Sequence, residues 1–142
     1  MVLLRKLSIY RRKDSFNHCI ERINQLRAHY PWSKLTYDGS KIDYVYLIWF
    51  ESKIVGFLEA SYNELDICFS SNIILHLHEL HISPSLHRRG IGRSVFIHLL
   101  SKGVKMQMVV VNDNENMIAL VNRFNVIKQC KSKKITNFII GA

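Results

Sequence analysis

Residues 80–100 constrain the fold more than any other stretch, because a strand-like segment, a basic glycine loop and a helix-like segment follow one another there. Ile73 to Ile82 is apolar with partial alternation, which predicts a strand. Gly92 to Lys102 carries apolar residues at helical spacing, at Val95, Phe96, Leu99 and Leu100. Lys105 to Val111 is a short apolar run typical of a buried parallel strand. The order predicts a right-handed crossover and therefore an α/β or α+β domain.

The rest of the chain adds elements on both sides of this crossover. Asp14 to Tyr30 has helical periodicity, with Asp14 as expected N-cap and Pro31 as the stop. Two β-rich runs flank a three-residue turn and predict a hairpin. We expect these strands at Tyr44–Phe50 and Ile54–Tyr62, a short strand at Leu65–Phe69, a helix at Glu115–Phe124, and closing strands at Val126–Cys130 and Ile135–Ile140. With 142 residues and no repeat or linker, we expect one domain over residues 1–142.

Composition excludes several other classes of protein. Hydrophobic residues make up 48% of the chain and only two residues are proline, which indicates a globular protein rather than a disordered one. No run approaches the about 18 apolar residues of a membrane span, and apolar residues precede Arg5 and Lys6, unlike a signal peptide. We therefore expect a cytoplasmic protein without membrane contact. Cys19, Cys68 and Cys130 form no CxxC pair, so reduced thiols in or near the core are expected.

The formal net charge of +9 points to an anionic partner or ligand. The cations gather in three patches. We interpret the two terminal patches as solvated surface, with a nucleic-acid-binding surface as the alternative. The patches are Arg5, Lys6, Arg11, Arg12, Lys13; Arg88, Arg89, Arg93; and Lys128, Lys131, Lys133, Lys134.

The middle patch lies inside the glycine loop, His87-Arg88-Arg89-Gly90-Ile91-Gly92-Arg93. The first N–H groups of a helix have no partner within it and attract anions, and glycine lets backbone approach a ligand. A Walker A loop is absent, and Val95 stands at the third glycine position of a dinucleotide fingerprint. The loop therefore predicts a phosphate or pyrophosphate site, with a plain glycine helix start as the alternative.

This segment resembles motif A of the GNAT superfamily of N-acetyltransferases, [QR]-x-x-G-x-[GA] after an apolar strand that often ends in proline. His87 replaces the usual Gln or Arg. The resemblance implies a mixed central sheet of about six or seven strands flanked by about three or four helices. It also implies acetyl-CoA as co-substrate, without a metal.

The resemblance further implies roles for individual residues. The backbone of Leu80, His81 and Ile82 would pair with the pantetheine arm, and a backbone N–H near Leu80 would polarise the thioester carbonyl. The pyrophosphate would be held by the glycine loop, through His87, Arg88, Arg89, Gly90, Ile91, Gly92 and Arg93.

His76 and His78 are candidate general bases. Their spacing puts both side chains on one face of a strand, with Glu79 and His81 on the other. A histidine with a pKa near ~6.5 can take the proton that an ammonium substrate must lose. His76-Leu77-His78 also resembles the arylalkylamine N-acetyltransferase branch, where a His-x-His pair relays this proton. Glu79 is an alternative base. The alternative interpretation is that the two histidines are structural, as half-buried, hydrogen-bonded residues of the strand. A metal site formed with His81 is disfavoured, because the ligands do not converge.

Residues 114–126 resemble a later family motif, N-x-x-A-x-x-L-Y-x-x-x-G-F. Asn114 would cap a helix and reach the pantetheine arm, and Asn125 would take the left-handed conformation of the usual glycine. Val121 stands where many members carry the tyrosine that protonates the leaving thiolate. Tyr44, Tyr46 and Tyr62 are the possible substitutes.

The expected activity is transfer of acetyl from acetyl-CoA to a primary amine by direct attack, in a monomer or homodimer. Asp14 to Lys41 would form one wall of the acceptor site, including Tyr30, Trp32 and Tyr37. A protein amine or an aminoacyl-tRNA is the alternative acceptor, with tRNA suggested by the terminal basic patches. A third hypothesis, based on Val121, is a non-catalytic CoA- or nucleic-acid-binding module on the same fold.

Overall fold

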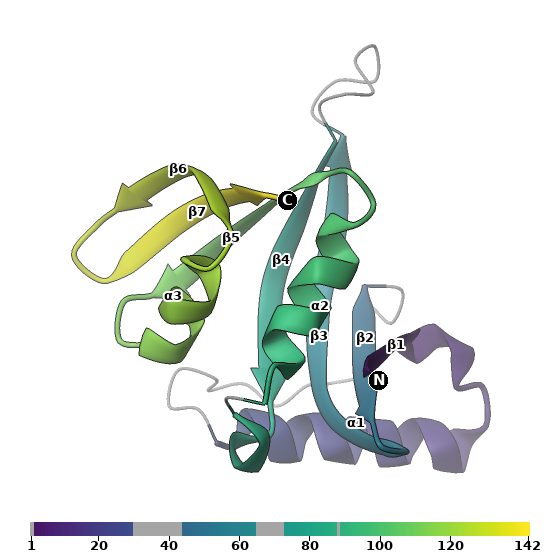
Figure 1. Ribbon diagram of the computed structural model, residues 1–142. Coiled ribbons are helices and arrows are strands. Elements are labelled where there is room, and N and C mark those ends of the chain that lie inside the picture. Colours follow the sequence, from purple (N-terminus) through teal and green to yellow (C-terminus); the bar gives the residue numbers. More distant parts are fainter. Residues whose placement is uncertain (1, 30–43, 65–72, 88) are drawn as a thin grey trace. The chain divides into compact units, whose positions relative to one another are not determined.

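The strands are hydrogen-bonded in the order β1-β2-β3-β4-β5-β7-β6, which makes one mixed sheet (Figure 1). The computed structural model describes residues 2–29, 44–64, 73–87 and 89–142. In that part of the chain there are seven strands and three α-helices, which confirms the expected α/β architecture. The strands are β1 Val2–Lys6, β2 Val45–Phe50, β3 Lys53–Glu64, β4 Ile73–Ile82, β5 Lys105–Val111, β6 Asn125–Lys131 and β7 Ile135–Gly141; the helices are α1 Lys13–Arg27, α2 Ile91–Leu100 and α3 Glu115–Val121.

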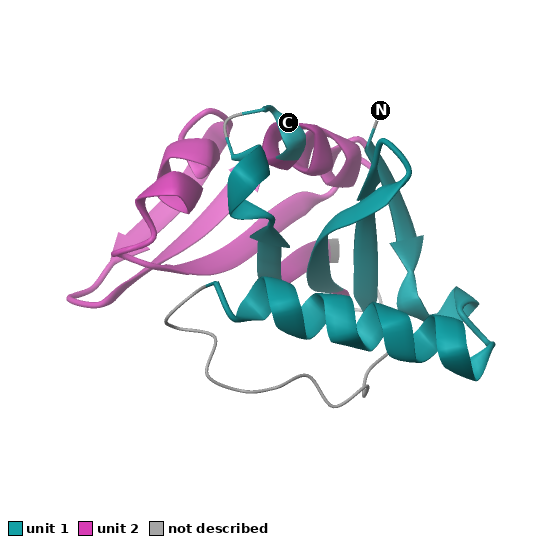
Figure 2. Cartoon of the chain, turned by 90° about the horizontal axis from the view of Figure 1, so that it is seen from below, with its two compact units in different colours: residues 1–60, 79–91 teal, residues 61–78, 92–142 magenta. Residues whose placement is uncertain are grey.

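The chain divides into two compact units, coloured separately in Figure 2. Unit 1 comprises residues 1–60 and 79–91, and unit 2 comprises residues 61–78 and 92–142. The expectation of one domain stays a prediction. The expected strand at Leu65–Phe69, the loop aromatics Tyr30, Trp32 and Tyr37, the stop at Pro31 and Cys68 lie outside the described residues.

Unit 1 is built on α1 and the β2–β3 hairpin. Side chains from both elements form a core with the short 3-10 turn Leu7–Ile9. The core residues are Leu7, Cys19, Ile23, Leu26, Val45, Leu47, Ile54 and Phe57. The hairpin turns at Glu51 and Ser52, which both have positive φ, as a tight two-residue turn requires. The predicted hairpin is therefore confirmed.

The start of α1 differs from the prediction. Arg12 is the N-cap, without a side-chain cap hydrogen bond, and Asp14 lies within the first turn. The helix begins at Lys13, one residue before the expected cap, and the Asp14 carboxylate there still faces the positive end of the helix dipole.

Within unit 2, the first part of β4 pairs in parallel with β5, as predicted. Pairing runs from Ile74 with Lys105 to Leu77 with Met108. The expectation that β5 is buried on both faces is wrong, because its burial alternates and Val109 is 54% exposed. One face of β5 and β7 is buried, through Met106, Met108, Val110, Thr136, Phe138 and Ile140.

Two further expectations in unit 2 are also corrected. Asn125 does not take the left-handed conformation, since among described residues other than glycine only Glu51 and Ser52 have positive φ. It instead opens β6 opposite Gly141. Cys130 is exposed on β6, because this strand lies at the edge of the sheet, whereas Cys19 is buried as expected. None of the described helices is long and apolar enough to cross a membrane.

Candidate active site

His76 and His78 lie on one face of β4, as their spacing predicts. Their rings are stacked with centroids 6.2 Å apart and an interplanar angle of 15°. Leu75 precedes the pair and Leu77 lies between its two members, and both leucines are buried in the core. The alternation of the strand therefore places the two imidazoles on the face opposite Leu75 and Leu77.

The two histidines differ in their hydrogen bonds. His78 Nε2 lies 2.9 Å from Ser61 Oγ on β3. His76 Nε2 is buried and makes no hydrogen bond to any residue that the structure describes. Burial, and secondarily the charge of His78, lower the pKa of His76 below its ordinary 6.5. The neutral form of His76 is thus favoured, and a neutral imidazole has one ring nitrogen able to accept a proton.

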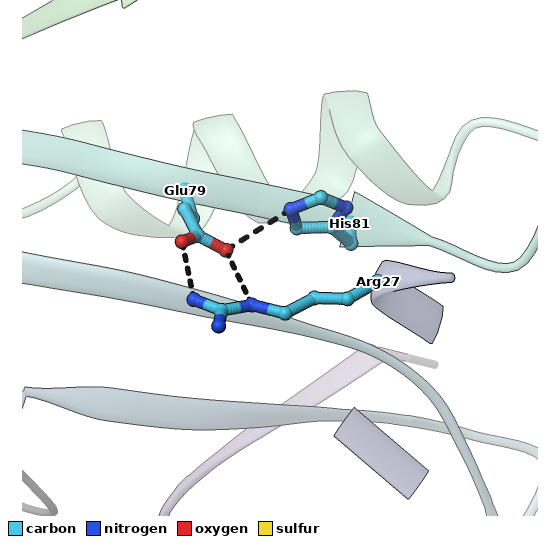
Figure 3. A network of polar contacts seen from close by, with 3 residues as sticks. All are labelled: Arg27, Glu79 and His81. Atoms are coloured by element: carbon cyan, nitrogen blue, oxygen red, sulfur yellow. Dashed lines mark hydrogen bonds and ion pairs between the residues drawn. The ribbon is translucent and has the colours of Figure 1, made fainter. Parts of the chain in front are cut away.

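Glu79 and His81 follow on the opposite face of β4 and belong to unit 1. Figure 3 shows the Glu79 carboxylate held between His81 and Arg27, the last residue of α1. Arg27 Nε donates to Glu79 Oε2 at 3.1 Å and its Nη2 donates to Oε1, while His81 Nε2 lies 3.1 Å from Oε2. His81 is 4% exposed, and its ring is stacked on Phe57. Its side chain is therefore not available to a ligand, and the predicted contact with the pantetheine arm can involve only its backbone.

The ionised form of Glu79 is favoured by this arrangement. Burial alone raises the pKa of the carboxyl, but hydrogen bonds from His81 and Arg27 and the charge of Arg27 outweigh it and lower the pKa overall. Such a carboxylate is a weak base. Sequence reasoning missed Arg27, because nothing near it in the chain signals a partner 52 residues away.

The glycine loop has the backbone geometry that an anion site requires. Gly90 has φ +78°, a left-handed conformation, and a Cβ there would meet nothing within 4 Å. Helix α2 begins immediately afterwards, with no acidic residue in its first turn. Arg89 and Arg93 are exposed, and neither forms an ion pair with a described carboxylate. The loop therefore combines helix N–H groups and uncompensated positive charge.

His87, at the altered first position of the motif, has a structural contact. Its Nε2–H donates to the carbonyl of Ile82 at 3.1 Å, which ties the loop to the end of β4. Ile91 is 2% exposed, so its backbone alone can serve the loop. Arg88 lies outside the described residues.

Further along the chain, the predicted cap of α3 is confirmed. Asn114 Oδ1 accepts from the Met117 N–H at 3.3 Å. Val121 is fully buried, so this position supplies core packing rather than an acid. Tyr44 and Tyr62 are exposed, and the Lys102 ammonium lies 5.8 Å from the Tyr62 ring. Among the residues described, no three histidine, cysteine or acidic side chains are grouped to hold a metal ion.

A model of the acetyltransferase (GNAT) family matches residues 9–125, most of the chain. The chain belongs to the GNAT acetyltransferase family. The membership confirms the resemblance drawn from the glycine loop. It leaves open the arylalkylamine branch, and a search of proteins with curated functions found no match.

Solved structures confirm the GNAT fold. Arabidopsis thaliana Naa50 in complex with the bisubstrate analogue CoA-Ac-MVNAL is 14% identical, with a TM-score of 0.64 over 99% of this chain and 98% of that one. Arabidopsis thaliana NAA60 in complex with acetyl-CoA is 12% identical, with a TM-score of 0.65 over 99% and 98%. Ard1 from Thermoplasma volcanium is 14% identical, with a TM-score of 0.66 over 99% and 98%. At these identities, the similarity is one of fold.

Proposed function

We propose that this GNAT protein transfers the acetyl group of acetyl-CoA to a primary amine. The observation that carries the proposal is the loop at Gly90, whose left-handed backbone leads into an α2 N-terminus without acidic residues. Arg89 and Arg93 beside it are exposed cations, so the loop fits a pyrophosphate. Family membership and neighbours solved with acetyl-CoA or its analogues support the same ligand.

The remaining contacts with acetyl-CoA follow the family pattern. The parallel ladder between β4 and β5 ends at Leu77 and Met108, so Leu80 is not part of it. We therefore assign the backbone of Leu80, His81 and Ile82 to the pantetheine arm. Asn114, whose Oδ1 already caps α3, would approach the same arm with its amide nitrogen.

His76 is the proposed proton acceptor. The substrate ammonium gives its proton to the imidazole, and the amine nitrogen attacks the thioester carbonyl carbon. The backbone N–H of Leu80 stabilises the oxygen of the tetrahedral intermediate. The C–S bond then breaks, sulfur leaves as the CoA thiolate, and the nitrogen releases its second proton to solvent, so that the acetyl group stays on nitrogen as an amide. Burial lowers the pKa of His76, and the charge of His78, which Ser61 holds by a hydrogen bond, lowers it further.

The leaving sulfur needs no dedicated acid in this scheme. Val121 is buried and carries no proton, and a thiol with a pKa of about 8.5 leaves readily as a thiolate. Solvent then protonates it.

A protein amine is the second candidate acceptor. Naa50 was solved with an analogue that joins CoA to a peptide, and it covers nearly all of this chain in fold. The terminal lysines and arginines would also suit an aminoacyl-tRNA, and in the N-terminal patch Arg5 and Lys6 each lie 5.9 Å from an aromatic ring, that of Trp49 and that of Tyr46.

A thiol-release assay with acetyl-CoA separates these possibilities. The acceptors are a panel of small primary amines, peptides with free N-termini, and aminoacyl-tRNA. Rapid turnover of small amines supports the leading proposal, and turnover of peptides alone moves the acceptor to proteins. Absence of turnover with every acceptor, together with intact acetyl-CoA binding, would instead establish a non-catalytic binding module.

A further inference from the structure

Arg27 ends helix α1 and closes a four-residue cluster in unit 1 with Glu79, His81 and Phe57. Its guanidinium donates to both carboxylate oxygens of Glu79 and lies 5.7 Å from the centre of the Phe57 ring. His81 hydrogen-bonds to the same carboxylate and stacks on the same ring, with centroids 4.8 Å apart at 9°. Each member therefore contacts at least two others.

The cluster is largely shielded from water. The Arg27 side chain is 14% exposed and the Glu79 side chain 28% exposed. Hydrogen bonds between ionised groups are strong in such surroundings, and the planar fork of arginine fixes direction as well as distance. The Glu79 and His81 side chains therefore have one strongly preferred orientation.

Leu80 lies between these two anchored residues, and the backbone after it is also fixed. The Ser83 N–H donates to the Val55 carbonyl at 2.8 Å, and His87 holds the Ile82 carbonyl. A Cβ on Gly56 would run into the His81 carbonyl oxygen, so β3 packs directly on this stretch of β4. The peptide groups around Leu80 are thus held on both sides.

We infer that Arg27, Glu79 and His81 are positioning residues, which fix the Leu80 N–H toward the thioester oxygen, and that Glu79 is not the general base. This inference rests on the proposed acetyl transfer. As a base, Glu79 would have to accept a proton at an oxygen that already accepts hydrogen bonds from Arg27 or His81. As an anchor, it uses these bonds as they stand.

Kinetics of four variants test the inference. Arg27→Ala should lower kcat about tenfold to a hundredfold, the effect of slightly misplacing a reacting group, and change the Kd of acetyl-CoA by less than about threefold. Arg27→Lys should fall between wild type and Arg27→Ala, since lysine keeps the charge but loses the fork. Glu79→Gln keeps an acceptor for Arg27 and should retain about tenfold more activity than Glu79→Ala.

Arg22→Ala is the matched control for this series. Arg22 also lies on α1 and bonds to unit 1, through the Ile54 carbonyl at 3.0 Å, but not to Glu79. Because Arg22 does not contact Glu79, its replacement should lower kcat far less than Arg27→Ala does, at a temperature where all variants are folded. Wild-type kcat in Arg27→Ala, or equal loss in Glu79→Gln and Glu79→Ala with disappearance of the acidic limb of the pH–rate profile, would overturn the inference.

A second readout needs no catalysis and separates failure of the inference from failure of the proposed function. Amide hydrogen exchange at Ser83, whose N–H is hydrogen-bonded to the Val55 carbonyl on the same stretch of backbone, should become at least about tenfold faster in Arg27→Ala than in Arg22→Ala, because the anchored backbone opens more often. Unchanged exchange refutes the anchor, whether or not the protein acetylates amines.

Discussion

His76 and His78 share a face of β4, yet their surroundings give them different chemistry. Ser61 hydrogen-bonds to His78, whereas His76 Nε2 makes no hydrogen bond to a described residue. In the proposed mechanism, a pair that looks equivalent in the sequence thus becomes a proton acceptor and a modulator of its pKa. The difference can be read from the pH dependence of the rate.

Replacing His78 by Gln should move the acidic limb of the pH–rate profile to higher pH. The base must be neutral, so activity is lost as the pH falls through the pKa of His76. Burial lowers that pKa below its ordinary 6.5, and the charge of His78 lowers it further. Removing the charge of His78 therefore raises the pKa of His76, and the acidic limb moves with it.

The matched experiments use His76→Gln, which should abolish the limb, and His98→Gln, which should leave it in place because His98 is exposed on α2. A limb that persists in His76→Gln would contradict the assignment of His76 as base.

Gly90 and Gly103 offer a matched pair for testing the anion loop. Both have a left-handed backbone, with φ of +78° and +75°, and a Cβ on either meets nothing within 4 Å. Glu at either position therefore costs about 1–2 kcal/mol of backbone strain. Only Gly90→Glu should also raise the Kd of acetyl-CoA, by at least about tenfold, since it brings a carboxylate to the loop. Calorimetric titration measures the Kd of acetyl-CoA for both variants, and equal Kd values in Gly90→Glu and Gly103→Glu would refute the motif assignment.

At the scale of elements, the close packing of β3 on the end of β4 depends on Gly56. A Cβ there collides with backbone, at the His81 carbonyl, and not with a movable side chain. The strand pair can relieve such a contact only by separating.

Gly56→Ala should therefore lower the free energy of unfolding by about 1–3 kcal/mol. Gly141→Ala is the control, because its Cβ would lie 3.1 Å from Ile127 Cδ1, the movable end of a side chain that is 47% exposed. That variant should lose less than about 1 kcal/mol in denaturant titration. Equal losses would mean that β3 and β4 are not tightly packed at Gly56.

At the scale of the whole molecule, the formal net charge of +9 attracts anions generally, but position decides which cations hold a ligand. Arg89 and Arg93 flank the start of α2, whereas Lys131 and Lys133 lie at the β6–β7 turn. Both pairs are exposed.

Replacing Arg89 and Arg93 together by Ala should weaken acetyl-CoA binding at least about tenfold. Replacing Lys131 and Lys133 by Ala lowers the net charge equally and should leave the Kd within about twofold at physiological salt. Fluorescence titration at two salt concentrations compares them. Equal weakening in the two double variants would show that overall charge, and not the loop, attracts the ligand.

The sequence alone determined most of the helices and strands and the local backbone of the glycine loop. Helix and strand periodicity are local, so β4, β5 and β7 could be located within a residue of their observed ends. The turn conformation of Gly90, the start of α2 and the Asn114 cap also depend on neighbouring residues only. The family resemblance rested on these local features, which is why it was confirmed.

The tertiary structure alone decided which side chains meet. Ser61 reaches His78 across the β3–β4 pair, and Arg27 reaches Glu79 from a residue 52 positions away. Such contacts are set by strand register and helix packing, to which many distant residues contribute small energies. The glycine loop could therefore be predicted as an anion site from its own residues, whereas the distinct environments of His76 and Glu79 required the fold.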